Sequence, residues 1–189
     1  MAELILSKEI VVNKSASRVI GVMAFVILTA LGAFVRLPLP FTPVPITLQT
    51  FFVLLSGAFL GSRLGAASQL GYILLGIAGL PIFTNAGSGL FYLFGPTGGY
   101  IVGFVLISYF VGRFIRYSQN NLFFTFVLLC VGDFILLLAG VVWLKVIFGY
   151  RLSRLFLIGF IPFVPGDLIK AWAASFIYWK LKARIKEVF

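Results

Sequence analysis

The run LFFTFVLLCVGDFILLLAGVVWL, residues 122–144, decides the fold class of this chain. Asp133 is its only charged residue, and its apolar residues are continuous rather than alternating with polar ones. An α-helix needs about 20 consecutive apolar residues to cross the hydrocarbon core of a bilayer. A strand of a membrane barrel instead alternates apolar and polar positions. The run therefore predicts a membrane-spanning α-helix.

Further apolar runs lie on both sides of this segment. Residues 19–35 carry no charge and end before LPLPFTPVPITLQ, residues 37–49, whose prolines interrupt helices. GSRLG, residues 61–65, is expected to turn the chain, and a glycine-rich segment at 81–100 separates later runs. We predict an all-α integral membrane protein, a single transmembrane domain over residues 1–189. Its six transmembrane helices are expected at about 19–35, 47–60, 64–80, 96–115, 122–144 and 160–179.

The composition excludes several classes of protein. Apolar residues make up 61% of the 189 residues and charged residues 11%, whereas a soluble domain carries about 25% charged residues. Six spans leave no room for a nucleotide-binding domain, and no phosphate-binding G-x-x-x-x-G-K-[ST] motif occurs. There is no histidine, and Cys130 is the only cysteine, so we expect neither a metal site nor a disulfide within the chain.

Basic residues predict the orientation of the bundle. The net charge of +10 suggests loops that face anionic cytoplasmic lipid rather than nucleic acid. With six spans both termini lie on one side, and the Lys and Arg residues divide ten to four between the two sides. The terminal side holds Lys8, Lys14, Arg18, Arg63, Arg113, Arg116, Lys180, Lys182, Arg184 and Lys186, and the other side holds Arg36, Lys145, Arg151 and Arg154. We therefore expect a protein of the cell membrane with both termini in the cytoplasm. The proline-rich and glycine-rich segments are then expected on the outer side.

Three ionisable residues lie within the predicted spans or at their edges. A charged residue at the centre of a span costs about 2.5–3.5 kcal/mol on insertion scales, so each one requires an explanation. Asp167 and Lys170 are three residues apart, on one helix face, after PFVPG. They could be a helix cap with its counter-ion, but we favour the polar end of a binding pocket. For Asp133, a structural hydrogen bond to a neighbouring helix is favoured over contact with a ligand.

Four motifs resemble those of one family. They are PxPxTLQ at 43–49, GYILLGIAGLPIF at 71–83, GPTGGYIVGF at 95–104 and PGDLIK at 165–170. Their order and spacing resemble the BioY family, the biotin-binding S components of energy-coupling factor (ECF) transporters. The resemblance implies a six-helix bundle that captures biotin, the transported ligand, at its outer face, with no cofactor. It also implies a transmembrane T component and a pair of ATPases as partners in the bilayer.

Biotin has a ureido ring with two N–H donors and one carbonyl acceptor, an apolar thioether ring and a carboxylate. Asp167 is expected to accept a ureido N–H, while Lys170 either balances Asp167 or binds an anionic group. Asn85 in the outer glycine-rich loop is a further ligand candidate. Tyr100 and Gln49, at helix starts on the outer side, are also candidates, although Tyr100 could equally be an interface residue and Gln49 could equally bond loop backbone. The proline-rich loop is a candidate lid.

Three alternatives remain at the level of sequence. An intramembrane enzyme would need a nucleophile and base or a metal set, and a chain without histidine and with one cysteine offers only an Asp/Lys arrangement for it. A stand-alone biotin facilitator would move substrate without an ATPase partner. An S component for another small vitamin would share the same layout. The AxxxA motif that often docks S components has no clean copy in the first helix, which offers only Ser17 with Gly21 and Thr29 with Ala33.

Overall fold

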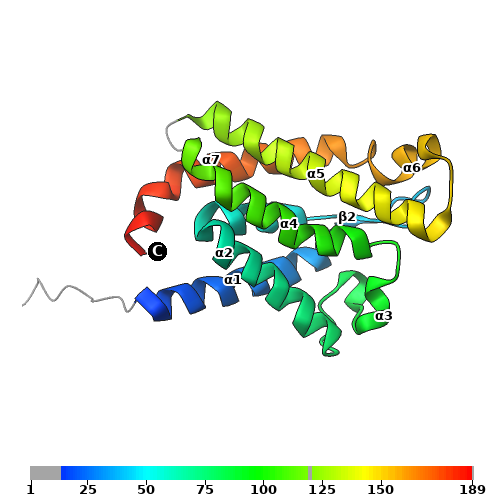
Figure 1. Ribbon diagram of the computed structural model, residues 1–189, viewed down its shortest axis with the longest axis horizontal. Coiled ribbons are helices and arrows are strands. Elements are labelled where there is room, and N and C mark those ends of the chain that lie inside the picture. Colours follow the sequence, from blue (N-terminus) through cyan, green and yellow to red (C-terminus); the bar gives the residue numbers. More distant parts are fainter. Residues whose placement is uncertain (1–13, 119–120, 189) are drawn as a thin grey trace, which may run out of the picture.

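The computed structural model describes residues 14–118 and 121–188, which form one elongated helical bundle (Figure 1). Lys8, counted above among the basic residues, lies outside the described residues. The seven α-helices of the described part are α1 Lys14–Phe34, α2 Gln49–Ile77, α3 Leu90–Leu93, α4 Gly98–Phe114, α5 Leu122–Phe148, α6 Leu152–Gly159 and α7 Val164–Val188. The remaining elements are strands β1 Arg36–Leu37 and β2 Ile46–Thr47, and the 3-10 turns η1 Thr84–Ala86 and η2 Ile115–Tyr117.

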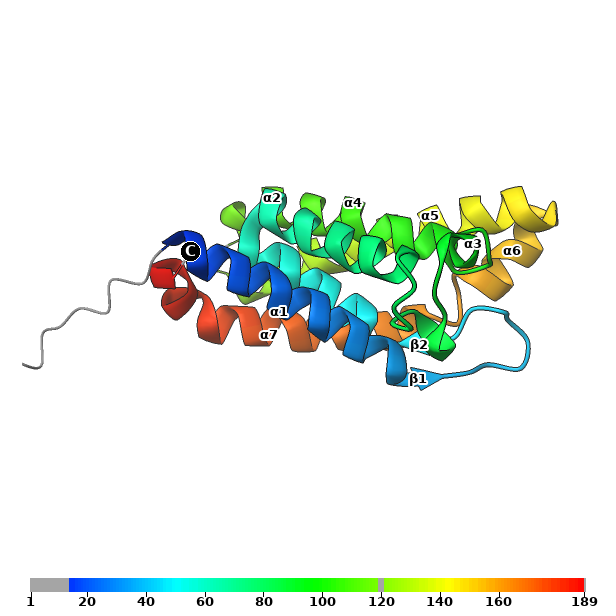
Figure 2. The same cartoon turned by 90° about the horizontal axis from the view of Figure 1, so that it is seen from below.

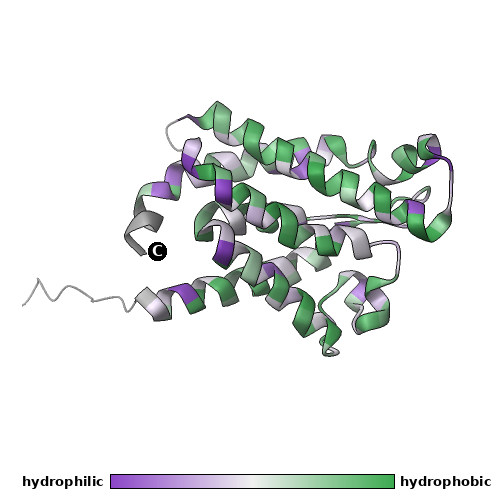
Figure 3. Cartoon of the chain, viewed as in Figure 1, coloured by the Kyte–Doolittle hydropathy of each residue, from purple (hydrophilic) through white to green (hydrophobic). Residues whose placement is uncertain are grey.

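Several of these helices are long and apolar enough to cross a membrane. Four qualify alone, and α6 with α7, bent by 48° at a short break, qualifies as a fifth. Many large apolar side chains point outward, for example Ile20, Val146 and Ile169, which are 67%, 74% and 70% exposed. Green, the colour of hydrophobic residues, also predominates along the helices in Figure 3. The prediction of a mainly helical chain with several apolar candidate spans is confirmed, whereas the count of six spans is not.

The chain folds back on itself within α2. Gly61 has φ 76° and ψ −179°, a backbone conformation that favours glycine and interrupts the helix. In a straight helix Gln49 and Tyr72 would lie about 35 Å apart, yet Gln49 Nε2 donates to Tyr72 Oη over 2.7 Å. The first limb of α2 (residues 49–60) therefore lies against the second limb (residues 62–77). The turn predicted at 61–65 is confirmed at Gly61, and the second limb ends at Ile77 rather than at residue 80.

Small residues let the two limbs and α4 approach closely. A Cβ at Gly65 would lie 2.6 Å from Ser108 Oγ, and one at Gly57 would meet the Ser108 backbone. Ser56 Oγ and Ser108 Oγ share a hydrogen bond of 2.8 Å, and Gln69 Nε2 donates to Ser56 Oγ over 3.0 Å. The glycines thus serve packing inside the chain, where close backbones bring buried polar groups within hydrogen-bond distance.

The bundle has two distinct ends. Helix α1 begins and α7 finishes at one end, while the β1–β2 hairpin, α3 and α6 lie at the opposite end (Figure 2). Irregular segments therefore gather at one end, as expected from the proline-rich and glycine-rich loops. We call this end the hairpin end of the bundle.

Candidate ligand-binding site

A small cavity lies at the hairpin end, where segments far apart in the sequence converge. It is lined from the hairpin by Val44, Pro45 and Thr47, from α2 by Gln49 and Thr50, from η1 by Thr84, from the start of α4 by Thr97, Tyr100, Ile101 and Phe104, from α5 by Leu136 and Leu137, and from the α6–α7 region by Phe163, Asp167 and Lys170. Its free volume is about 40 Å³, room for about three water molecules at about 10–15 Å³ each.

Asp167 and Lys170 form a buried ion pair in this wall. Lys170 Nζ lies 2.6 Å from Asp167 Oδ1, and the two side chains are 11% and 6% exposed, respectively. Pro165 and Gly166 lie in the first turn of α7. Asp167 and Lys170 follow them at a spacing of three residues, so their side chains project from one face near the start of this helix. Asp167 lies inside α7 and its own N–H already donates to Phe163 O, so it does not occupy the cap position before the helix. The counter-ion role considered for Lys170 is confirmed.

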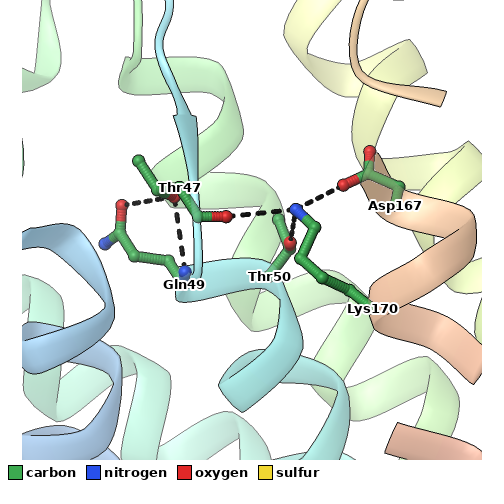
Figure 4. Close-up of polar contacts among 5 residues, drawn as sticks. All are labelled: Thr47, Gln49, Thr50, Asp167 and Lys170. Carbon is green, nitrogen blue, oxygen red and sulfur yellow. Dashed lines mark hydrogen bonds and ion pairs between the residues drawn. The ribbon is translucent and has the colours of Figure 1, made fainter. Parts of the chain in front are cut away.

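Lys170 also binds the hairpin and α2. Its ammonium donates to Thr50 Oγ1 over 2.5 Å and to Thr47 O over 3.1 Å (Figure 4). An ammonium group has three N–H donors, and with Asp167 all three have partners. Lys170 therefore neutralises Asp167 and holds three elements together, and it would have to exchange one partner to bind a ligand.

Gln49 lines the cavity but its amide already serves the protein. Its Oε1 accepts from Thr47 Oγ1 at 3.2 Å and from Thr84 Oγ1 at 3.3 Å, while its Nε2 donates to Tyr72. Tyr72 Oη in turn donates to Ile82 O over 3.2 Å. Gln49 thus joins the hairpin, both limbs of α2 and the loop that holds η1.

Tyr100 and Asn85 have different positions. Tyr100 lines the cavity and donates from its hydroxyl to Gly159 O over 2.6 Å, which fastens α4 to the end of α6. Asn85 adopts φ 64° and lines a neighbouring pocket with Arg36 and the loop prolines. Of the five predicted site residues, four meet in one cavity, and Asn85 lies in the neighbouring pocket.

Asp133 does not make the hydrogen bond that was predicted for it. It lies on α5 and is 4% exposed, and neither carboxyl oxygen has a hydrogen-bond partner among the described residues. The expected hydrogen bond to a neighbouring helix is wrong. Asp133 instead lines a second cavity, which it shares with Asp167.

The sequence reasoning missed Thr47, Thr50 and Thr84. Thr47 stands in the quoted PxPxTLQ motif and Thr50 directly follows it, but isolated threonines carry no signal of their own in an apolar chain. Thr47 and Thr50 contact the site through Lys170 of α7, and Thr84 contacts it through Gln49 of α2, so their role depends on segments distant in the sequence.

Comparisons with known proteins agree with one another. The sequence model described as "BioY family" matches residues 7–187. A probable biotin transporter BioY of Pyrococcus horikoshii is 35% identical over 170 residues, covering 88% of this chain and 97% of that protein. The biotin transporter BioY of Thermotoga maritima is 37% identical over 158 residues, covering 84% and 91%. A crystal structure of the S-component for biotin from an ECF-type ABC transporter matches with a TM-score of 0.85 at 25% identity, covering 90% and 93%. With a family match over nearly its whole length, this chain belongs to the BioY family.

Proposed function

We propose that this chain is the biotin-binding S component of an ECF-type transporter and that it binds biotin at the hairpin end of the bundle. The names of its relatives and of the matching crystal structure support the ligand and the assembly. The observation that carries the site is the buried Asp167–Lys170 pair in a cavity with otherwise largely apolar walls. Because the family is one of transporters, biotin is cargo, and we propose neither an enzymatic step nor a cofactor.

The lining suits the parts of the vitamin. Asp167 supplies a carboxylate that accepts a ureido N–H, and such a charge-assisted hydrogen bond is about twice as strong as a neutral one. Thr50 or Lys170 can donate to the ureido carbonyl. Ile101, Phe104 and Phe163 provide apolar contact for the thioether ring.

The hairpin is the part of the wall most suited to act as a lid. Pockets for small molecules measure about 300–1,000 Å³, so a cavity of about 40 Å³ must widen to admit biotin. Val44 and Pro45 come from the loop between β1 and β2. Thr42 Oγ1 donates to Ile158 O over 2.6 Å, which fastens this loop to α6. We propose that breaking this contact opens the site.

We propose six crossings with both termini in the cytoplasm. The two limbs of α2 supply two crossings, α1, α4 and α5 one each, and α6 with α7 the sixth. The hairpin end then faces outward, in keeping with the ten-to-four division of basic residues. A T component and an ATPase pair complete the transporter. Thr29 and Ala33 on α1 are fully buried, so they are not part of the docking face.

Equilibrium binding of labelled biotin to the purified chain tests the function. We expect saturation at one site, competition by unlabelled biotin and none by thiamine or riboflavin. Competition by another vitamin, or no saturable binding, would overturn the assignment to biotin. Biotin flux into liposomes that contain the chain alone would instead support the stand-alone facilitator.

A further inference from the structure

A second cavity lies beside the candidate site, between α5 and the α6–α7 region. It has a volume of about 240 Å³, and its wall includes Phe134, Phe160 and Val164. Leu137 and Asp167 line both this cavity and the smaller one. The two spaces therefore adjoin, and the carboxylate of the Asp167–Lys170 pair stands at their boundary.

Asp133 is the unexplained group of the second cavity. It precedes Leu137 by four residues, so it lies on the same face of α5, about 6 Å farther from the hairpin end. Its two carboxyl oxygens are the only buried side-chain nitrogen or oxygen atoms within residues 14–118 and 121–188 for which no hydrogen-bond partner is found. A buried polar group without a partner destabilises a protein. In either protonation form the carboxyl has an oxygen that accepts hydrogen bonds, so a ligand that brings a donor would satisfy it.

The ligand of the proposed function brings two such donors. In a five-membered cyclic urea the two N–H bonds point to opposite sides of the carbonyl, so one carboxylate cannot accept both. The smaller cavity alone, at about 40 Å³, is too small for the fused rings, whereas the adjoining space adds about 240 Å³. We propose that the ureido ring lies across the boundary, with one N–H donating to Asp167 and the other to Asp133. This inference rests on the proposed function and adds Asp133 as a specificity-determining residue.

Asp133→Leu is the decisive variant because it removes the acceptor at similar size. Since Asp133 has no partner within the described protein, the unliganded variant should keep or raise its melting temperature. Its affinity for biotin should fall about tenfold or more, the loss expected when a buried N–H is left without an acceptor. Asp133→Asn retains one acceptor oxygen and should bind biotin more tightly than Asp133→Leu does. Val142→Leu, on the exposed face of α5 and outside both cavities, is the matched control and should bind as wild type does.

Two biotin analogues, each methylated on one ureido nitrogen, identify the contact. Both should bind wild type more weakly than biotin does. In Asp133→Leu, the difference in affinity between biotin and the analogue methylated on the nitrogen that faces Asp133 should shrink several-fold. The difference in affinity for the other analogue should stay as in wild type, as in a double-mutant cycle.

Each outcome separates the two proposals. Biotin affinity unchanged in Asp133→Leu, or equal analogue differences in wild type and variant, would overturn this inference and leave the proposed function standing. If Asp133→Leu binds biotin as wild type does but loses a lipid that co-purifies with wild type, the second cavity holds lipid. That result would also overturn this inference. If wild type itself fails to bind biotin, both proposals fall together.

Discussion

Gln49 and Tyr72 lie 23 positions apart in the sequence, and the Gln49 side-chain amide donates to the Tyr72 hydroxyl over 2.7 Å. Gln49 begins the first limb of α2, and Tyr72 lies on the second limb, beyond the break at Gly61. The same hydroxyl donates to Ile82 O in the loop that leads to η1. This hydrogen bond therefore joins Gln49, in the wall of the candidate site, to the second limb of α2.

Tyr72→Phe should lower the stability of the bundle. The change removes the acceptor of Gln49 Nε2 and the donor to Ile82 O, and an unsatisfied buried group costs about 1–3 kcal/mol. We expect a lower melting temperature in detergent, measured by size-exclusion chromatography after heating. Tyr109→Phe, on the exposed face of α4, is the control and should melt as wild type does. Equal melting of the two variants would show that the pair does not stabilise the fold.

Asp167→Asn should weaken biotin binding about tenfold or more. The variant keeps the size of the side chain and removes its charge, and a hydrogen bond to a charged group contributes about 1.5–3 kcal/mol. Isothermal titration calorimetry on the folded variant provides the measurement. A folded Asp167→Asn protein with wild-type affinity would remove Asp167 from the binding site.

Lys170→Ala should reduce both stability and binding. It leaves the Asp167 carboxylate buried without its counter-ion, and breaking a buried pair by removing one partner costs about 3–5 kcal/mol. Combining Lys170→Ala with Asp167→Asn should restore much of the melting temperature, because no unpaired charge remains, but not the affinity for biotin. If the double variant is no more stable than Lys170→Ala alone, the pair does not act as a unit.

The loop between β1 and β2 should close over bound biotin. Amide hydrogen exchange across residues 36–49 is expected to slow on addition of biotin, while exchange near η2 stays unchanged. Thr42→Val removes the hydrogen bond to Ile158 O and should speed exchange in the loop without ligand. Biotin binding with no change in loop exchange would refute the lid.

Thiol labelling in intact cells tests the orientation. In a Cys130→Ala background, Tyr150→Cys at the hairpin end should react with a membrane-impermeant maleimide, whereas Tyr117→Cys should react only after lysis. Both positions border helix ends, and Tyr117 is 72% exposed. The opposite labelling pattern would place the termini outside.

Much of the fold could be predicted from single segments of the sequence. The uninterrupted apolar stretch at 122–144 predicted a membrane helix, because a bilayer requires length and apolarity along one segment. Gly61 marked the turn within α2, since a break depends on local backbone freedom. The spacing of Asp167 and Lys170 predicted a shared helix face, and the structure pairs them.

Other features depended on contacts between distant segments, which the sequence does not encode locally. No pattern along the chain places Thr47 and Thr50 around Lys170, since they come from the hairpin and α2, more than a hundred residues earlier. Asn85 and Asp167 both follow loops at the hairpin end, yet they line different pockets because the proline-rich loop lies at the border of both. Asp133 was expected to bond a neighbouring helix, and only the packing of α5 against α7 shows that its carboxyl meets a cavity instead. The sequence by itself determined where the long apolar helices lie and which charges are buried, because both follow from local apolarity. Only the tertiary structure decided which polar groups satisfy one another, because that depends on how the helices pack.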